Sequence, residues 1–156
     1  MGLEIERKFL VDRAEWLKLE KGPSVSILQG YLAVDTERIV RVRLTDSMAY
    51  LTIKGVAKGY TRREFEYPIP SEDAQWMIQN LCVNTIEKER YTFHGSAHTW
   101  EVDVFHGKNE GLILAEIELS HEEEEIELPM WVGTEVSHDH RYFNSYLAEH
   151  PYCEWR

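Results

Sequence analysis

Charged side chains stand at every second position in several short stretches of this sequence. The first stretch, LEIERKFLV, carries Glu4, Glu6 and Lys8 on one face if it forms a strand. Arg41 and Arg43 repeat the same spacing in RIVRVRLT. Carboxylates are the ligands that hard divalent cations prefer, whereas arginine and lysine bind phosphate oxygens. Stretches of this kind could therefore hold a divalent metal ion beside a polyanion.

Five further stretches place charged residues on one side of the alternation and mostly apolar residues on the other. Their charged positions are Lys54 in YLTIKG, Arg62, Glu64 and Glu66 in RREFEYPI, Lys88 and Arg90 in IEKERYTF, Glu101 and Asp103 in HTWEVDVF, and Glu116 and Glu118 in LILAEIELS. An eighth stretch, SILQGYLA, is mostly uncharged. Alternation with a period of two predicts β-strands, so we expect about eight of them.

Turn sequences separate several of these strands, and sequential hairpins predict an antiparallel sheet. Helical patterns lie at residues 12–20, 71–81 and 137–150, each with an apolar stripe. A strongly twisted sheet of this size tends to close into a barrel, which also removes its exposed edges. The expected fold is therefore α+β, an antiparallel eight-stranded β-barrel (tunnel) with a few helices packed outside.

The charged faces of these strands could simply be solvated, which is ordinary for the Glu and Lys residues of a single strand. Their repetition favours the alternative, in which helices cover the apolar faces and the charged faces converge inside the barrel. Each desolvated ion carries a penalty of several kcal/mol, so a charged lumen indicates a function. The mixture of acidic and basic strands suits a metal ion and a polyanion together, because a simply acidic tunnel would repel the polyanion.

Length and composition restrict the class of protein. The 156 residues are 43% hydrophobic and show no linker-like segment, which predicts a single domain over residues 1–156. The formal net charge of −11 argues against nucleic acid as a partner, and no apolar run approaches the ~18 residues that a membrane span needs. A charged strand from residue 4 onward leaves no room for a signal peptide, so we expect a cytoplasmic protein. Cys82 and Cys153 are too few for a disulfide framework.

The segment EIERK matches the ExExK signature of the CYTH domain family, the triphosphate tunnel metalloenzymes. Further matches are RVR at 41–43, Lys54, REFE at 63–66, EKERY at 87–91, VDVF at 102–105, AEIEL at 115–119 and WVGTEVSHDHRYFNSYLA at 131–148. The chain resembles this family over essentially its whole length, in order. The resemblance implies an eight-stranded tunnel that binds a triphosphate together with one or two Mg²⁺ or Mn²⁺ ions.

The resemblance also implies roles for individual residues. Glu4, Glu6, Glu116 and Glu118 look like the metal-binding carboxylates, with Asp103 as a further ligand or a residue behind the ligands. Lys8, Arg41, Arg43, Lys54, Lys88 and Arg90 look like the groups that grip the triphosphate, and Arg62, Glu64 and Glu66 like tunnel-lining partners that support them. Tyr31 resembles a tyrosine that in some members lies against the ExExK lysine, here Lys8, and acts in proton transfer. A purely structural tyrosine fits that short match equally well.

Taken together, the residues and the resemblance imply a metal-dependent phosphohydrolase acting on a small triphosphate, with inorganic tripolyphosphate as the leading substrate. Class IV adenylyl cyclase or thiamine triphosphatase activity would use a similar tunnel. A protein of another class, which binds polyphosphate or nucleotide without turnover, also fits. The sequence leaves open the choice between Mg²⁺ and Mn²⁺, and whether the protein is a homodimer.

Overall fold

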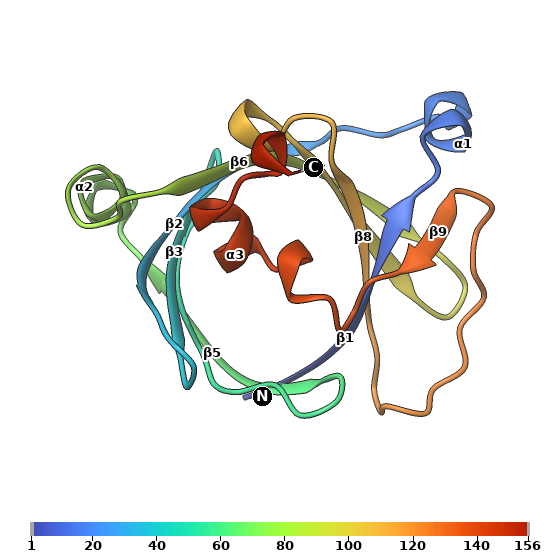
Figure 1. Ribbon diagram of the computed structural model, residues 1–156, viewed down its shortest axis with the longest axis horizontal. Coiled ribbons are helices and arrows are strands. Elements are labelled where there is room, and N and C mark those ends of the chain that lie inside the picture. Colours follow the sequence, from blue (N-terminus) through green and yellow to red (C-terminus); the bar gives the residue numbers. More distant parts are fainter. Residues whose placement is uncertain (1, 156) are drawn as a thin grey trace.

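The chain forms a closed antiparallel β-barrel in its computed structural model, which describes residues 2–155. Within this range the strands are β1 (Leu3–Val11), β2 (Val25–Val34), β3 (Ile39–Leu44), β4 (Ala49–Lys54), β5 (Thr61–Ile69), β6 (Thr85–His94), β7 (Thr99–Phe105), β8 (Ile113–Glu118) and β9 (Val132–Glu135). They are ordered β5-β4-β3-β2-β6-β7-β8-β1-β9, and pairing of β5 with β1 closes the ring (Figure 1). The expected eight-stranded barrel is confirmed, and β9 is an additional strand outside it.

Strand β1 completes the barrel because it pairs with three neighbours in succession. Its first residues pair with β5, from Leu3 opposite Arg63 to Ile5 opposite Thr61. Its middle pairs with β8 over residues 6–10, and its end pairs with β9. The segment that carries ExExK therefore spans the seam between the two ends of the sheet.

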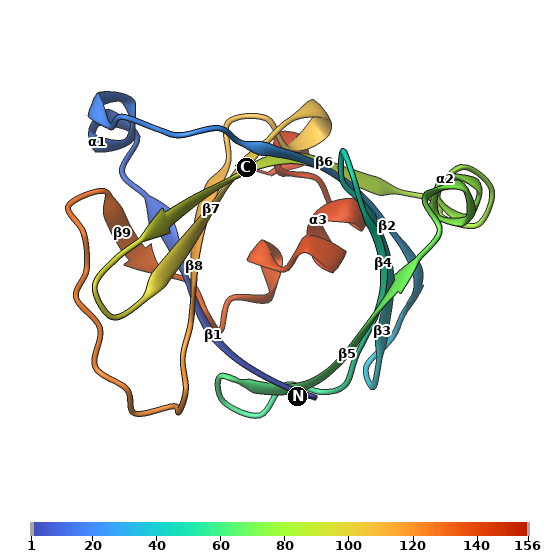
Figure 2. The same ribbon diagram turned by 180° about the vertical axis from the view of Figure 1, so that it is seen from behind.

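Apolar side chains on the outer faces are covered by the first two helices, α1 (Arg13–Lys18) and α2 (Ser71–Asn80). Trp16 of α1 packs with Phe9, Trp100 and Trp131 in one cluster. The other helix contributes Ala74 and Ile78 to a second cluster, which includes Val42 and Ala49. Gly30 of β2 is required where the chain approaches α2, because a Cβ there would lie 2.7 Å from Cys82 Sγ. Both helices lie outside the barrel, as expected (Figures 1 and 2).

The C-terminal segment differs from the single outer helix expected over residues 137–150. It forms two 3-10 turns, η2 (His140–Tyr142) and η3 (Tyr152–Glu154), on either side of α3 (Asn144–Glu149). Phe143 has extended backbone (φ −71°, ψ 136°), so η2 and α3 are separate. Figures 1 and 2 show α3 inside the ring of strands. Its Leu147 packs there with Ile86, Phe105, Leu112 and Leu114, so apolar side chains fill one end of the barrel.

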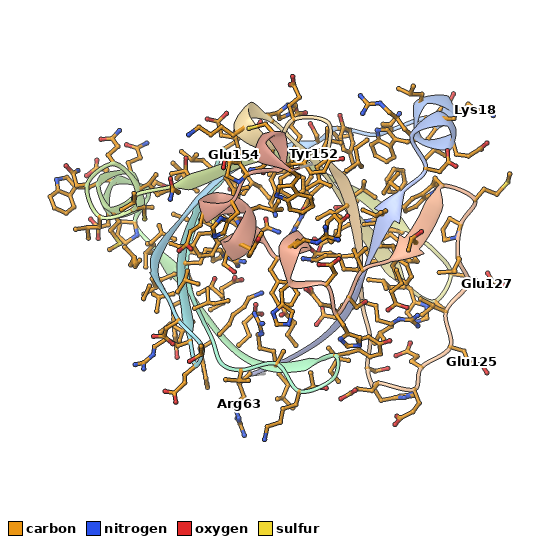
Figure 3. All side chains as sticks on the ribbon, in the orientation of Figure 1. Lys18, Arg63, Glu125, Glu127, Tyr152 and Glu154 are labelled. Atoms are coloured by element: carbon orange, nitrogen blue, oxygen red, sulfur yellow. The ribbon has the colours of Figure 1, made fainter. Side chains whose placement is uncertain are left out.

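Residues on each strand alternate between the lumen and the outside. On β5, Arg62 and Glu64 line the internal cavity, whereas Arg63 between them points away from the barrel (Figure 3). Arg7 likewise lies on the outer face of β1, where its guanidinium donates two hydrogen bonds to Glu135 at 2.9 and 2.6 Å. No helix within residues 2–155 is long and apolar enough to cross a membrane. The barrel thus presents one charged face of almost every strand to its lumen.

Candidate active site

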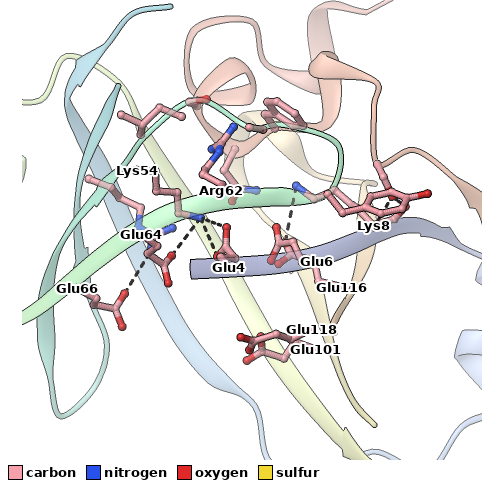
Figure 4. A pocket seen from close by; sticks show the side chains of 18 of the residues that line it. Glu4, Glu6, Lys8, Lys54, Arg62, Glu64, Glu66, Glu101, Glu116 and Glu118 are labelled. Carbon is pink, nitrogen blue, oxygen red and sulfur yellow. Dashed lines mark hydrogen bonds and ion pairs between the residues drawn. The ribbon is translucent and has the colours of Figure 1, made fainter. Parts of the chain in front are cut away.

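The lumen holds a cavity of about 310 Å³ (Figure 4). Its lining includes every residue that the sequence analysis assigned to the site except Asp103: Glu4, Glu6, Lys8, Tyr31, Arg41, Arg43, Lys54, Arg62, Glu64, Glu66, Lys88, Arg90, Glu116 and Glu118. These residues come from seven of the eight barrel strands. They face one another because the closed sheet directs one side of each strand inward. The cavity is therefore lined mainly by charged groups of both signs.

The carboxylates of β1 and β8 lie opposite one another in the strand register. Glu6 pairs with Glu118, and Lys8 pairs with Glu116, across the antiparallel ladder. Burial, and then the negative charges of Glu116 and Glu4, raise the pKa of Glu6 to about 8. Lys54 and Lys8 oppose this shift in the pKa of Glu6 but do not outweigh burial and the neighbouring carboxylates.

Glu116 lies in the same group but has the opposite shift. Burial alone would raise its pKa, but Lys8 and Arg90 outweigh burial and lower the pKa to about 2. The Lys8 ammonium is 3.8 Å from Glu116 Oε1 and donates a hydrogen bond to the carbonyl of Tyr142 at 3.1 Å. Glu116 is therefore ionised over the whole neutral range, while its neighbour Glu6 resists ionisation.

Two arginines of β3 project into the cavity beside this group. Arg41 donates through Nη2 to Thr52 Oγ1 at 3.1 Å and to Glu66 Oε2 at 3.4 Å. Among residues 2–155, its Nε is buried without a hydrogen-bond acceptor. Burial, followed by the positive charges of Arg41 and Arg90, lowers the pKa of Arg43 to about 10. This wall of the cavity thus has an excess of positive charge and a donor that lacks an acceptor.

The comparison with known proteins decides the family. The sequence model of the CYTH domain matches residues 2–146. The chain belongs to the CYTH domain family. This confirms the resemblance carried by ExExK and the motifs that follow it, and membership implies a requirement for a divalent metal ion.

Relatives of this CYTH protein match it over nearly their whole length. It is 46% identical over 157 residues to an inorganic triphosphatase from Acetivibrio thermocellus, which covers 100% of this chain and 99% of the relative. It is 34% identical to an inorganic triphosphatase from Nitrosomonas europaea, over 93% of this chain and 96% of that one. A crystal structure of an inorganic triphosphatase superimposes with a TM-score of 0.65 at 31% identity, covering 93% of this chain and 97% of the other.

The donor set of this CYTH cavity fits a hard cation. Among its lining residues there is no histidine or cysteine, and the candidate ligands are carboxylate oxygens, which Mg²⁺ and Mn²⁺ prefer. Within residues 2–155, no three acidic, histidine or cysteine side chains are arranged to hold one ion. A cation would also offset the repulsion by Glu116 and Glu4, which adds to the effect of burial on the pKa of Glu6.

Asp103 is the one residue of the expected site that is not part of the cavity lining. It is 1% exposed and accepts hydrogen bonds from Lys88 Nζ at 2.7 Å and from Arg90 Nε and Nη2 at 2.8 and 3.0 Å. Burial raises its pKa, but Arg90 and Lys88 outweigh burial and lower the pKa overall. Both oxygens are thus engaged by cations, and Asp103 fixes the two basic side chains in place.

The three supporting residues of β5 all line the cavity but make different contacts. Glu66 accepts hydrogen bonds from Thr52 at 2.8 Å and from Arg41. Glu64 lies 3.4 Å from the Lys54 ammonium, which also donates to Glu4 at 3.1 Å. In the part of the chain that the structure describes, Arg62 forms no ion pair, and its guanidinium lies 5.6 Å from the centre of the Phe143 ring. Arg62 therefore keeps its donors available.

The sequence analysis missed several residues of the cavity. Glu101 of β7 lies opposite Glu116 in the register, and Figure 4 shows it beside Glu118. Burial, and to a lesser extent Glu116, raise the pKa of Glu101, although Arg90 opposes the shift. The alternation of HTWEVDVF placed Glu101 on the inner face, so the signal was available. By contrast, nothing in the sequence indicated that the C-terminal segment would supply Phe143, Asn144 and Ser145 to the lining.

The raised pKa of Glu6 predicts how the stability of the metal-free protein depends on pH. Glu6 faces Glu4, Glu116, Glu118, Lys8 and Lys54. A carboxyl whose pKa is about 8 in the fold and 4.5 when unfolded stabilises the fold below pH 4.5, and this contribution is lost as the pH rises to about 8. At ~1.4 kcal/mol per unit, the loss is on the order of 5 kcal/mol.

The Glu6→Gln variant cannot ionise at this position, so its melting temperature should fall less than that of the wild type between pH 5 and pH 8 without metal. Calorimetry in the presence of a chelator measures the difference. The exposed Glu125→Gln variant is the control and should follow the wild type. Equal pH profiles for Glu6→Gln and wild type would show that Glu6 ionises freely in the fold.

Proposed function

We propose that this CYTH protein is a metal-dependent triphosphatase that hydrolyses inorganic tripolyphosphate to pyrophosphate and phosphate. The observation that carries the proposal is one cavity in which cations from four strands converge beside a group of carboxylates. The cations are Lys8, Arg41, Arg43, Lys54, Lys88 and Arg90. The two inorganic triphosphatases that are 46% and 34% identical to this chain support the same activity.

In this proposal, the carboxylates of β1 and β8 hold the metal ion, Mg²⁺ or Mn²⁺. The ligands are Glu4, Glu6, Glu116 and Glu118, with Glu101 close enough to Glu118 to assist (Figure 4). When bound, the ion would polarise phosphate oxygens and lower the pKa of a bound water molecule. Ligation would also offset the burial and the repulsion by Glu116 and Glu4 that together raise the pKa of Glu6.

The basic residues bind the phosphate oxygens and offset the charge that spreads over the transferring phosphoryl group. Arg41 and Arg43 provide planar forks that bind two oxygens at once, and the unsatisfied Nε of Arg41 is one donor for such an oxygen. Lys88 and Arg90 are held against Asp103, so their donors are fixed in place before the substrate arrives. Hydrolysis by water needs no covalent enzyme intermediate.

Lys8 and Tyr31 are the proposed catalytic residues. Lys8 lies beside Glu116, where its ammonium can contact both the substrate and the carboxylate group. Tyr31 lines the cavity, and burial raises the pKa of its phenol, although Arg41 and Arg43 oppose this shift. The phenol therefore stays protonated at neutral pH and can donate a hydrogen bond to a phosphate oxygen.

The lining also favours an inorganic substrate over an organic one. Its apolar and aromatic members are Tyr31, Ile39, Ala57, Tyr60 and Phe143, and the rest of the lining is almost entirely charged or polar. An adenine or thiazolium ring would find little apolar surface there, whereas a polyphosphate would find donors along its whole length.

A substrate panel tests this function. The purified protein is incubated with tripolyphosphate, ATP or thiamine triphosphate and with Mg²⁺ or Mn²⁺, and phosphate, pyrophosphate and cyclic AMP are measured. Phosphate release that is fastest from tripolyphosphate is the expected result. Cyclic AMP with pyrophosphate from ATP would identify a cyclase, faster turnover of thiamine triphosphate a thiamine triphosphatase, and binding without turnover a polyphosphate-binding protein.

We further propose that residues 1–156 act as one domain in the cytoplasm, without nucleic acid as a partner. Both cysteines, Cys82 and Cys153, are free thiols, as is usual in a reducing compartment. The net charge of −11 disfavours binding to a phosphate backbone over a broad surface. Analytical ultracentrifugation would show whether the protein is a monomer or a homodimer.

A further inference from the structure

Gln29 is an uncharged side chain buried among the charged residues of the cavity wall. It is fully buried on the inner face of β2, and three hydrogen bonds engage both ends of its amide. Its Oε1 accepts from Arg43 Nε at 2.9 Å. Its Nε2 donates to Tyr31 Oη at 2.9 Å and to Asn144 Oδ1 at 3.2 Å. The amide therefore links two strands of the barrel to helix α3.

The direction of each bond in this chain is fixed by the chemistry of its ends. Arg43 Nε can only donate, so the atom of Gln29 that faces it must be the oxygen. Asn144 Oδ1 also accepts from Lys88 Nζ at 2.8 Å, and an ammonium likewise can only donate. Since cations stand at both ends, neither amide can be turned over without placing two donors together. The NH₂ group of Gln29 must then face Tyr31.

This arrangement determines what the Tyr31 hydroxyl can do. Its oxygen accepts a hydrogen bond from Gln29, and in the hydrogen bonds of residues 2–155 it has no acceptor for its own hydrogen. Tyr31 lines the cavity and stands opposite Arg41 in the strand register, just as Gln29 stands opposite Arg43. The hydroxyl hydrogen is therefore available beside the two arginines.

We propose that Gln29 is a positioning residue that makes Tyr31 a hydrogen-bond donor to the bound polyphosphate. The inference rests on the proposed triphosphatase function, because it takes polyphosphate as the ligand of this cavity. Gln29 itself does not touch the substrate. It acts by occupying the phenol oxygen as an acceptor, so that the phenol hydrogen points to the ligand, and by holding Arg43 in the same network.

A double-mutant cycle with Gln29→Glu and Tyr31→Phe tests this role. A carboxylate at position 29 still accepts from Arg43 but cannot donate to Tyr31, so it takes the phenol hydrogen away from the cavity. Tyr31→Phe alone should weaken binding of tripolyphosphate about tenfold, as expected for a hydrogen bond to a charged group. In the Gln29→Glu background, the same change should weaken binding by less than about twofold, because the donor is already lost.

Binding is measured by calorimetry without metal, and kcat and KM are measured with Mg²⁺. Gln79→Glu makes the same charge change at an exposed site on α2, and there Tyr31→Phe should keep its tenfold effect. Gln29→Met removes the amide without adding a charge. It replaces Gln29→Glu in the double-mutant cycle if Gln29→Glu does not fold. In the Gln29→Met background, where the amide no longer donates to Tyr31, the effect of Tyr31→Phe on binding should fall clearly below tenfold. Melting temperatures separate unfolding from loss of binding.

The outcomes distinguish the inference from the function on which it rests. An equal effect of Tyr31→Phe in wild type, Gln29→Glu and Gln29→Met overturns the role of Gln29, even if the wild type hydrolyses tripolyphosphate normally. A wild type that binds tripolyphosphate without hydrolysing it overturns the proposed function, while the calorimetric cycle still tests Gln29. A wild type that neither binds tripolyphosphate nor hydrolyses it with Mg²⁺ overturns both.

Discussion

Replacing Arg41 or Arg43 with alanine should lower kcat/KM for tripolyphosphate by roughly ten- to a hundredfold. Hydrogen bonds between charged groups contribute about 1.5–3 kcal/mol each, and ~1.4 kcal/mol corresponds to a factor of ten. The loss should be larger if the contacts strengthen as negative charge develops in the transition state. Initial rates of phosphate release at several tripolyphosphate concentrations measure the effect.

The fold should survive both arginine substitutions. Glu66, which pairs with Arg41, has a side chain that is 40% exposed and can be solvated when its partner is removed. Removing the buried guanidinium at position 43 also relieves its repulsion by Arg41 and Arg90. Circular dichroism and the melting temperature are expected to stay close to the wild-type values. Lysine at either position should restore activity only in part, because an ammonium cannot replace a planar fork.

Two surface arginines provide matched controls. Arg38 precedes β3 and has an exposed side chain, and Arg63 alternates with the cavity residues of β5 but points outward (Figure 3). Arg38→Ala and Arg63→Ala should leave kcat/KM within about twofold of wild type, as is usual for surface substitutions. If Arg38→Ala and Arg63→Ala impair hydrolysis as much as Arg41→Ala and Arg43→Ala, then the arginines of the lumen do not bind the polyphosphate specifically.

The barrel could be predicted from the sequence because its strands alternate charged and apolar residues with a period of two. LEIERKFLV and RIVRVRLT show this pattern on both faces, and the structure places Glu4, Glu6, Lys8, Arg41 and Arg43 inside. Strand β9 could not be predicted in the same way. Its four residues, VGTE, are too short to show a period, and the strand forms because Trp131 anchors it beside β1 in the outer cluster.

The position of α3 could not be predicted because helical spacing shows that an apolar stripe exists but not which surface it covers. Leu147 satisfies the pattern equally well outside the barrel or inside it. The inner face of the barrel has its own apolar positions, Ile86, Phe105 and Leu114, at one end of the barrel. Leu147 packs against these, so the helix lies inside and brings Asn144 to the cavity.

The example of Asp103 shows which part of a site alternation can predict. Glu101, Asp103 and Phe105 all lie on the face of β7 that is directed into the barrel. Along the strand, however, the lumen changes from the cavity at Glu101 to the apolar end at Phe105, with Asp103 between them. Parity gives the face of a residue but not its depth along the barrel axis. Gln29 was missed for another reason, since an uncharged residue gives no charge pattern.

Removing divalent metal with excess EDTA should abolish hydrolysis of tripolyphosphate, and Mg²⁺ or Mn²⁺ should restore it. A bound metal ion supplies several kcal/mol of transition-state stabilisation, so the rate should fall at least about a hundredfold. Mg²⁺ or Mn²⁺ is expected to restore activity because the cavity lining includes no histidine or cysteine and offers oxygen donors to a metal ion. Undiminished phosphate release in excess chelator would exclude the carboxylates of β1 and β8 as a catalytic metal site.

Glu118→Gln connects this metal dependence to a particular carboxylate. The variant removes one ligand from a group of repelling carboxylates, so the metal-free protein should melt at the wild-type temperature or above it, while turnover is lost. Glu123→Gln, at a side chain that is 90% exposed, should change neither property. A ligand that binds only the folded state raises the melting temperature, so Mg²⁺ should stabilise the wild type more than Glu118→Gln. If Mg²⁺ raises both melting temperatures equally while turnover is lost, then Glu118 acts on the substrate and does not hold the ion.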